Sequence, residues 1–219
     1  YLGIRKTDAE VEYIRAFNAE PFPRWAYQGD GWTIEKSLRF LRGQNTVVLC
    51  YTLLGGSETL EMELRPLFAL RGVHELAYQS NNNLTAQPHG RRHHRIAATA
   101  HTPELFFAHD GEFSTQPYWY LNTIYRREAE RGYAGLEDLW TPGVIRSTLK
   151  PGQTLHLVCS TDPIDFDTAV ITADRQFATT SRPAAQKRVA AVATGEFNRA
   201  AARIEAPAAR AEKHEADPT

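Results

Sequence analysis

Short apolar segments that end at turn residues constrain the fold more than any other feature of this sequence. Residues Thr46–Leu54 form the longest run of β-branched and aromatic side chains, which is typical of a central strand. In Leu60–Leu64, aliphatic residues alternate with Glu61 and Glu63, so one face of that strand should be buried and the acidic face should meet water. Repeated short strands of this kind predict an all-β fold, either an antiparallel sandwich or a barrel.

Turn signals separate further predicted strands on both sides of these two. Gly29-Asp30-Gly31 and Gly43-Gln44-Asn45 predict tight connections, and Lys150-Pro151-Gly152-Gln153 predicts a hairpin. The other strands that the pattern predicts are Glu12–Phe17, Trp25–Gln28, Trp32–Leu41, Val144–Leu149 and Thr154–Ser160, with weaker segments at Leu76–Gln79, Arg95–Ala100 and Glu104–His109.

The last quarter of the chain has a different composition. Pro163 ends the strand pattern, and residues 166–180 fit neither a strand nor a helix clearly. Residues 184–216 are rich in Ala, Arg and Glu, with a sparse set of apolar positions near helical spacing, which predicts a thin amphipathic helix. We therefore expect a β-sandwich domain in residues 1–165 and a partly helical linker in residues 166–219. Both ends read as parts of a longer protein, since the chain opens on Tyr1 rather than Met.

Composition argues against several classes of protein. The 219 residues carry a formal net charge of -1, whereas a dedicated nucleic-acid binder usually carries a basic domain. No apolar stretch reaches the roughly 20 residues that cross a bilayer, and no signal peptide is visible. We therefore expect a cytoplasmic protein with neither nucleic acid nor membrane as a partner. Cys50 and Cys159 lie in apolar runs, and we expect buried small hydrophobes rather than a disulfide or a zinc site.

Histidines are concentrated in the middle of the chain. Six of the eight fall between His74 and His109, and His89–Arg95 is the densest segment. Adjacent His93 and His94 would point to opposite faces of a strand, and the arginines of the segment would repel a metal cation. A solvated basic loop is therefore the favoured interpretation, ahead of metal or phosphate binding, and we expect no metal site and no cofactor.

Aromatic and acidic residues supply the remaining candidates. Pro117–Tyr125 contains four aromatic side chains, and the charged segment Arg126–Gly132 follows. These rings could stack on sugars, although core rings followed by a salt-bridged loop are the favoured interpretation. Glu137 and Asp138 precede the Thr141-Pro142-Gly143 turn. Glycoside hydrolysis needs two carboxyl groups about 5 to 9.5 Å apart across a cleft, which a sequence cannot show, and capping or loop hydrogen bonding is favoured for this pair.

Three blocks of residues, in order between about Tyr13 and Ser160, carry a family resemblance. They are Phe22–Trp25 with Ile34–Lys36 and Asn45–Val48, then Glu63–Leu67 with Arg71–His74, and finally Tyr118–Glu128 with Glu130–Gly132 and Glu137–Gly143. Together they resemble the N-terminal domain of bacterial and archaeal glycogen debranching enzymes of the amylo-α-1,6-glucosidase type. The chain departs from the family pattern at Gly72 and Val73, where Asp and Tyr are usual.

The resemblance implies an antiparallel two-sheet supersandwich without chemistry of its own, because the catalytic acids of such enzymes lie in a following (α/α)6 barrel. It implies packing on that catalytic domain of the same polypeptide and a share in the cleft for an α-glucan such as glycogen or limit dextrin. The residues expected at the cleft or the domain interface are Arg71, His74, Tyr118, Trp119, Asn122, Arg126, Glu137 and Asp138. The main alternative is a stand-alone carbohydrate-binding module, and the third is a complete hydrolase. An exposed apolar patch would favour docking, and a polar surface would favour the module.

Overall fold

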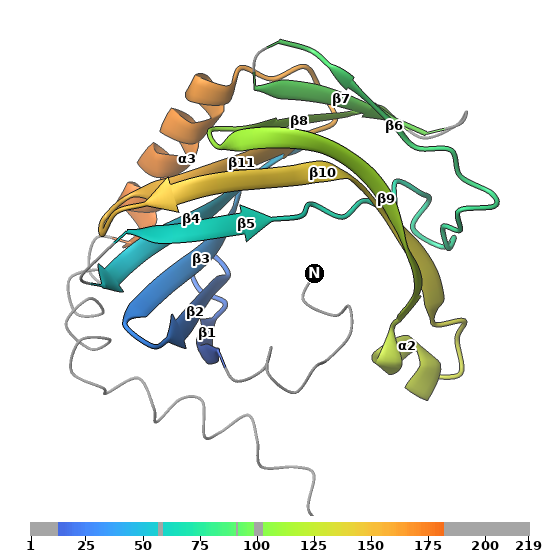
Figure 1. Cartoon of the computed structure of the whole chain (residues 1–219), viewed down its shortest axis with the longest axis horizontal. Coiled ribbons are helices and arrows are strands. Elements are labelled where there is room, and N and C mark those ends of the chain that lie inside the picture. The colour runs from blue at the N-terminus through green and yellow to red at the C-terminus, as the bar shows by residue number, and fades with distance from the viewer. Residues whose placement is uncertain (1–12, 57–58, 91, 99–102, 182–219) are drawn as a thin grey trace, which may run out of the picture.

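Two antiparallel sheets and a packed helix make up the computed structural model (Figure 1), which describes residues 13–56, 59–90, 92–98 and 103–181. The larger sheet has the strand order β1-β2-β3-β4-β11-β8-β7-β6, and the smaller sheet has the order β5-β10-β9. The large-sheet strands are β1 (Ile14–Asn18), β2 (Arg24–Gly29), β3 (Trp32–Phe40), β4 (Thr46–Gly56), β6 (Thr85–Pro88), β7 (His93–Ala97), β8 (Leu105–His109) and β11 (Thr154–Ser160). The small-sheet strands and the helices are β5 (Leu60–Leu64), β9 (Glu112–Ile124), β10 (Leu136–Leu149), α2 (Arg126–Glu130) and α3 (Phe166–Ser181). This arrangement confirms the all-β sandwich and excludes the barrel.

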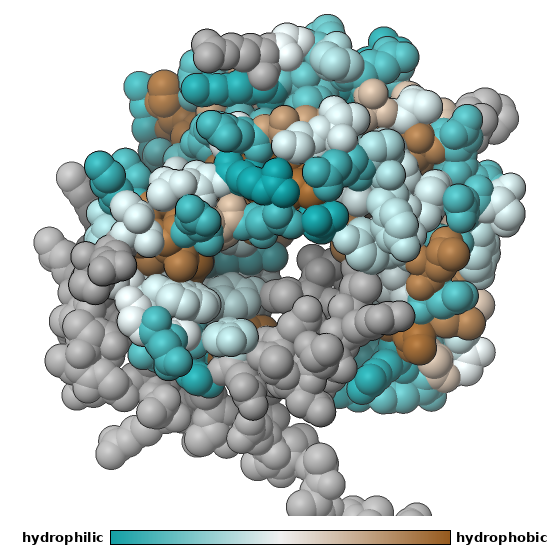
Figure 2. Space-filling view, viewed as in Figure 1, coloured by the Kyte–Doolittle hydropathy of each residue, from teal (hydrophilic) through white to brown (hydrophobic). Residues whose placement is uncertain are grey.

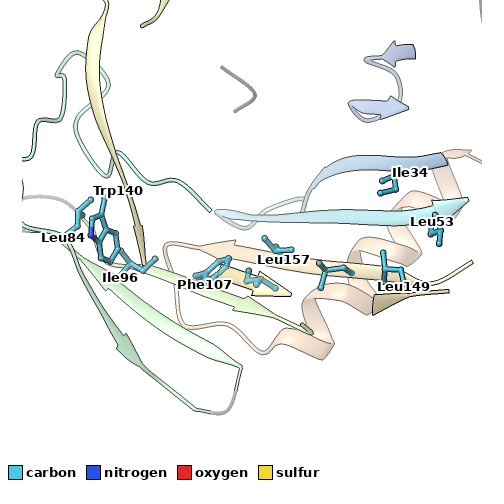
Figure 3. Packing of buried hydrophobic residues seen from close by; sticks show 10 residues of the cluster. Ile34, Leu53, Leu84, Ile96, Phe107, Trp140, Leu149 and Leu157 are labelled. Carbon is cyan, nitrogen blue, oxygen red and sulfur yellow. The ribbon is translucent and has the colours of Figure 1, made fainter. Parts of the chain in front are cut away.

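The main core lies between the two sheets. Figure 3 shows Leu84, Ile96 and Trp140 at one end of this cluster and Ile34, Leu53 and Leu149 at the other. From the smaller sheet, the aliphatic residues of β5 pack against the core while Glu61 and Glu63 are exposed. The alternation in the sequence therefore predicted the buried face of β5 correctly.

Helix α3 covers the outer face of the larger sheet. Phe166, Ala169 and Ala173 pack against Val48 and Cys50 of β4 in a second buried cluster, and the two alanines let the helix approach the strands closely. The side chains of Arg39 and Asp174 form an ion pair that joins β3 to the helix. The first part of the expected linker, residues 166–181, is thus packed on the sandwich, and the helix expected at 184–216 lies outside the described residues.

Both cysteines are free thiols and lie on strands, as predicted. Cys50 is buried beneath α3, and burial raises the pKa of its thiol to about 11. Cys159 packs against the main core from β11, so both residues serve as small apolar side chains. In the described part of the chain, no helix is long and apolar enough to span a membrane.

Turn residues are placed largely as the sequence predicts. Gly31, Gly43 and Gly152 have φ angles of 77°, 76° and 86°, a left-handed conformation that glycine adopts without steric cost. They connect β2 to β3, β3 to β4 and β10 to β11. The hairpins expected around residues 30 and 151 are confirmed.

The strand predicted at Leu76–Gln79 is wrong. Its backbone does not join a ladder, because the N–H groups of Ala77 and Gln79 donate to the carboxylates of Glu137 and Asp138 at 2.9 and 3.0 Å. Side-chain acceptors of this kind give the backbone an alternative to strand pairing. The segment is a loop that is held against the smaller sheet.

The solvated loop expected at His89–Arg95 is also wrong in part. Residues from His93 onward form β7, and His94 is only 9% exposed. Its ring packs 4.2 Å from that of Phe113. His94 is a core position that the sequence did not indicate, because its neighbours in the chain are hydrophilic.

The β9–β10 hairpin extends well beyond β5, the third strand of the smaller sheet. β5 pairs only with Ile145–Leu149, whereas β9 pairs with β10 from Leu136 to Arg146. Figure 1 shows the two long strands curving away from the sandwich and ending at α2. At the irregularity in the β9–β10 register between Thr141 and Gly143, a Cβ on Gly143 would lie 2.2 Å from the carbonyl oxygen of Ser114, so this close approach requires glycine.

Candidate functional site

The candidate residues from the sequence lie on the β9–β10 hairpin and on the loop that follows β5. Glu137 and Asp138 begin β10, and Asn122 lies near the end of β9. Arg71 and His74 lie between β5 and β6, and the other candidates are Tyr118 and Trp119 on β9 and Arg126 on α2. The fold brings four of the eight into one hydrogen-bonded cluster, namely Arg71, Asn122, Glu137 and Asp138.

Glu137 is the centre of this cluster. Its side chain is 0% exposed. Its Oε1 accepts hydrogen bonds from the N–H of Ala77, at 2.9 Å, and from Nε of Arg71. Its Oε2 accepts from Nη2 of Arg71, at 3.3 Å, and from the hydroxyl of Tyr125. Two donors on each oxygen occupy about all the lone-pair sites that a carboxylate has.

The electrostatic balance keeps Glu137 ionised. Burial alone would raise the pKa of this carboxyl, but hydrogen bonds from Arg71, Tyr125 and Ala77 outweigh that effect and leave the pKa below its ordinary value. A general acid for glycoside hydrolysis needs a raised pKa and contact with its substrate. The environment of Glu137 favours a structural role instead.

Asp138 ties the same loop to the other strand of the hairpin. Its Oδ2 accepts the N–H of Gln79 at 3.0 Å, and its Oδ1 accepts the N–H of Asn122 at 2.8 Å. Asn122 has a φ of 58° at an irregularity in the β9–β10 register between Glu137 and Leu139. We call this network the acid clamp and define it as Glu137 and Asp138 with their donors in Arg71, Ala77, Gln79, Asn122 and Tyr125.

Three members of the acid clamp were not among the candidates. Ala77 and Gln79 contribute only backbone N–H groups, which carry no signal in a sequence. Tyr125 ends the aromatic segment that the sequence singled out, and its hydroxyl is the feature that the pattern could have flagged. The role favoured for the acid pair, hydrogen bonding to a loop, matches the observed geometry.

The remaining candidates lie apart from the acid clamp. Trp119 packs against the main core, opposite Trp140 on β10. Tyr118 is 61% exposed, and its ring meets that of Tyr120 edge-on at 5.2 Å. Among the described residues, the exposed side chains of His74 and Arg126 make no hydrogen bond or ion pair.

Comparison with known proteins decides the family. The family model described as "Glycogen debranching enzyme N terminal" matches residues 5–156, which include the acid clamp and the whole hairpin. The chain belongs to this family. A search of curated proteins finds no match. As the N-terminal part of a debranching enzyme, the chain is one portion of a larger enzyme that also has a catalytic domain.

The debranching-enzyme domain exposes a group of apolar side chains at the end of its long hairpin. Leu121, Ile124, Tyr133 and Leu136 are between 47% and 67% exposed, and we call these four residues the tip patch. Ile124 and Leu136 are paired across the strands, so they share one face of the hairpin. Figure 2 shows brown, apolar surface in this region of the molecule.

Metal binding gains no support from the geometry. Within the described ranges, no group of three or more His, Cys, Asp or Glu side chains is placed to hold a metal ion. The histidines of β7 and β8 instead pack with aromatic rings, as His94 and His109 do with Phe113.

Proposed function

We propose that this chain is the non-catalytic N-terminal domain of a glycogen debranching enzyme with α-1,6-glucosidase activity. In this proposal it packs on the (α/α)6 catalytic barrel of the same polypeptide and helps to shape the α-glucan cleft. The observation that carries the proposal is the tip patch, which lies at the end of a hairpin that projects from the sandwich.

The composition of the hairpin end suits a domain interface. A contiguous apolar patch on a soluble domain commonly marks a contact site, and interfaces combine an apolar centre with a polar rim enriched in arginine. The tip patch supplies the apolar centre. The rim is supplied by α2, where Arg127 pairs with Glu130 and Arg131 pairs with Glu128 on the exposed surface.

The acid clamp supports the absence of chemistry in this domain. A debranching glucosidase needs one carboxyl group that can give up a proton and another that acts across the scissile bond. Glu137 and Asp138 are adjacent, buried and engaged with backbone and arginine donors. We therefore assign Arg71, Asn122, Glu137 and Asp138 to positioning the hairpin, and propose His74, Tyr118 and Arg126 as residues that contact the partner domain or the glucan.

Association with the catalytic domain tests the docking role. When the 219-residue chain is mixed with the separately produced catalytic domain of its own polypeptide, calorimetry should detect a complex. Ile124→Ser should weaken that complex at least tenfold, because a half-exposed apolar side chain would no longer be buried. Ile171→Ser is the matched control, since Ile171 is 50% exposed on α3, and it should leave the affinity unchanged.

Two results would contradict the proposal. The first is a failure of the docking test, seen either as no complex with the wild-type chain or as equal affinity for Ile124→Ser and the wild type. The second is release of glucose from a branched limit dextrin by this chain alone, which would show that the domain has catalytic groups of its own.

A further inference from the structure

We infer that the inner face of β1–β4 is a glucan-binding surface in its own right, separate from the β9–β10 hairpin. The surface is a row of four side chains, Phe17, Trp25, Lys36 and Tyr51, which we call the aromatic row. The identity of the ligand as a neutral α-glucan rests on the function proposed above, whereas the shape and chemistry of the row come from the contacts below.

The register of the strands places the four side chains in line. Phe17 is paired with Trp25, Trp25 with Lys36, and Lys36 with Tyr51. Directly paired residues on adjacent strands share a face of the sheet. With strands about 4.8 Å apart, three such steps give a row about 14 Å long, and its Phe17 end is the part most open to a ligand.

Each member of the row contacts the next. The ring centroids of Phe17 and Trp25 are 5.1 Å apart. The ammonium nitrogen of Lys36 lies 5.2 Å from the Trp25 ring centroid and 5.6 Å from that of Tyr51. The row is therefore a continuous series of contacting side chains, with one cation held between two of its three rings.

The row extends from the core toward solvent. Tyr51 packs against the main core, Trp25 and Lys36 are half-buried, and Phe17 is 44% exposed. Figure 1 shows β1, β2 and β3 extending beyond the edge of the smaller sheet. A second aromatic pair lies at the start of β3, where the rings of Tyr13 and Trp32 stack at 5.8 Å.

Lys36 adds hydrogen-bonding capacity to the strip. Burial lowers its pKa, and no acidic side chain forms an ion pair with it among the described residues. An ammonium group has three donors, and the rings on either side of Lys36 accept none of them as a conventional hydrogen bond. A partner with an apolar face and oxygen atoms along its edge would satisfy both the rings and the ammonium.

A pyranose ring has this combination of surfaces. Its axial C–H groups form an apolar face that stacks on an indole or phenol, and its hydroxyl oxygens accept from an ammonium. Ligand sites generally combine aromatic walls with a few polar groups that orient the ligand. The tip patch contains three aliphatic residues among its four and has no such cation between rings, so the two surfaces suit different partners.

Titration with maltoheptaose tests this inference on the 219-residue chain. We expect saturable binding at millimolar concentrations, detected by calorimetry and by NMR shifts of the indole N–H of Trp25. Phe17→Ser and Lys36→Met should each weaken binding at least fivefold. Phe40→Ser is the matched control, because Phe40 is 62% exposed at the far end of β3, and it should bind like the wild type. Circular dichroism and thermal melting would show that each variant is folded.

Several results would overturn the inference. They are no response of the wild type at millimolar maltoheptaose, full affinity in both Phe17→Ser and Lys36→Met, and loss of binding caused by Tyr118→Ala instead. Binding of sodium sulfate at Lys36 without any binding of maltoheptaose would identify an anion site and would equally reject a neutral glucan. The docking role is measured without glucan, through Ile124→Ser, so the two proposals can fail independently.

Discussion

Replacing Glu137 with glutamine should lower the free energy of unfolding by about 3 kcal/mol, which is typical when one partner of a buried ion pair is removed. The amide cannot accept at both of its ends. Whichever oxygen is replaced by the N–H₂ group, Arg71 and either Tyr125 or the N–H of Ala77 would face a donor where an oxygen now accepts. Urea denaturation would measure the loss as a lower midpoint with an unchanged slope.

Glu130→Gln is the matched control for this prediction. Glu130 forms an ion pair with Arg127 at 2.9 Å, but both side chains are well exposed, and such pairs contribute at most about 1 kcal/mol. The two substitutions remove the same charge from neighbouring parts of the hairpin. A loss in Glu137→Gln as small as in the control would show that the acid clamp does not hold the hairpin.

The clamp also links the local fold to the proposed docking role. Its donors come from the loop after β5 and from the end of β9, next to the start of β10. If Glu137→Gln loosens this region, the tip patch loses its defined position, so the affinity for the catalytic domain should fall although no patch residue has changed. A glutamine variant that keeps full stability but loses enzymatic activity would instead indicate a direct part in the reaction.

The predicted elements agree with the structure where a local pattern determines them. The alternation in Leu60–Leu64 and the apolar run from Thr46 reflect burial on one or both faces of a strand, and glycines at residues 31 and 152 adopt the left-handed turns that they favour. The long strand Glu112–Ile124 was missed because most of its residues are exposed on the projecting hairpin. Its pattern therefore lacks the strict alternation of a half-buried strand.

In the candidate site too, the sequence identified residues with a local pattern but not their distant partners. Glu137 and Asp138 were singled out because they stand beside aromatic residues and the Thr141-Pro142-Gly143 segment, and their favoured role needed only local knowledge. The turn expected at that segment is wrong, because the three residues lie within β10. The partners of these acids are backbone N–H groups about 60 residues away in the chain. The side chains of alanine and glutamine give no sign of such a contact, which follows only from how the loop runs alongside β10. Arg71 was found through the family resemblance rather than through its own pattern.

A pair of buried histidines is the basis of a second prediction, that acid strongly lowers the stability of the domain. Nε2 of His94 lies 3.2 Å from Nε2 of His109, and Nδ1 of His109 lies 3.0 Å from the carbonyl oxygen of Gly111. Because a carbonyl only accepts, Nδ1 of His109 carries its proton, and His94 must donate to the free Nε2 of His109. The pair is satisfied when both rings are neutral. Protonating His109 would place two N–H groups against each other in the core.

Acid should therefore destabilise the domain. Burial, with a smaller contribution from His109, lowers the pKa of His94 from 6.5 to about 4, and burial also lowers the pKa of His109. The neighbouring charged groups act in both directions, since Asp110 raises the pKa of His109 while Arg92 and His93 lower it. Between the lowered and the ordinary pKa of His94, from about 4 to 6.5, the unfolded chain binds more protons than the folded chain. The free energy of unfolding therefore falls as the pH falls. A shift of this size in the pKa of His94 corresponds to about 3 kcal/mol, at about 1.36 kcal/mol per unit of pKa.

His94→Gln should remove most of this acid sensitivity, because glutamine can still donate to His109 but does not titrate. The measurement is the free energy of unfolding between pH 4.5 and 6.5, a window that lies above the ordinary pKa of a glutamate carboxyl, near 4.3. Since the pKa of Glu137 is lower still, the stabilisation that Glu137 contributes is lost only at more acidic pH and does not enter this range. His74→Gln is the control, because His74 is exposed and makes no side-chain hydrogen bond or ion pair among the described residues. If His94→Gln keeps the pH dependence of the wild type, as the His74→Gln control should, the buried pair is not the acid-sensitive element of the core.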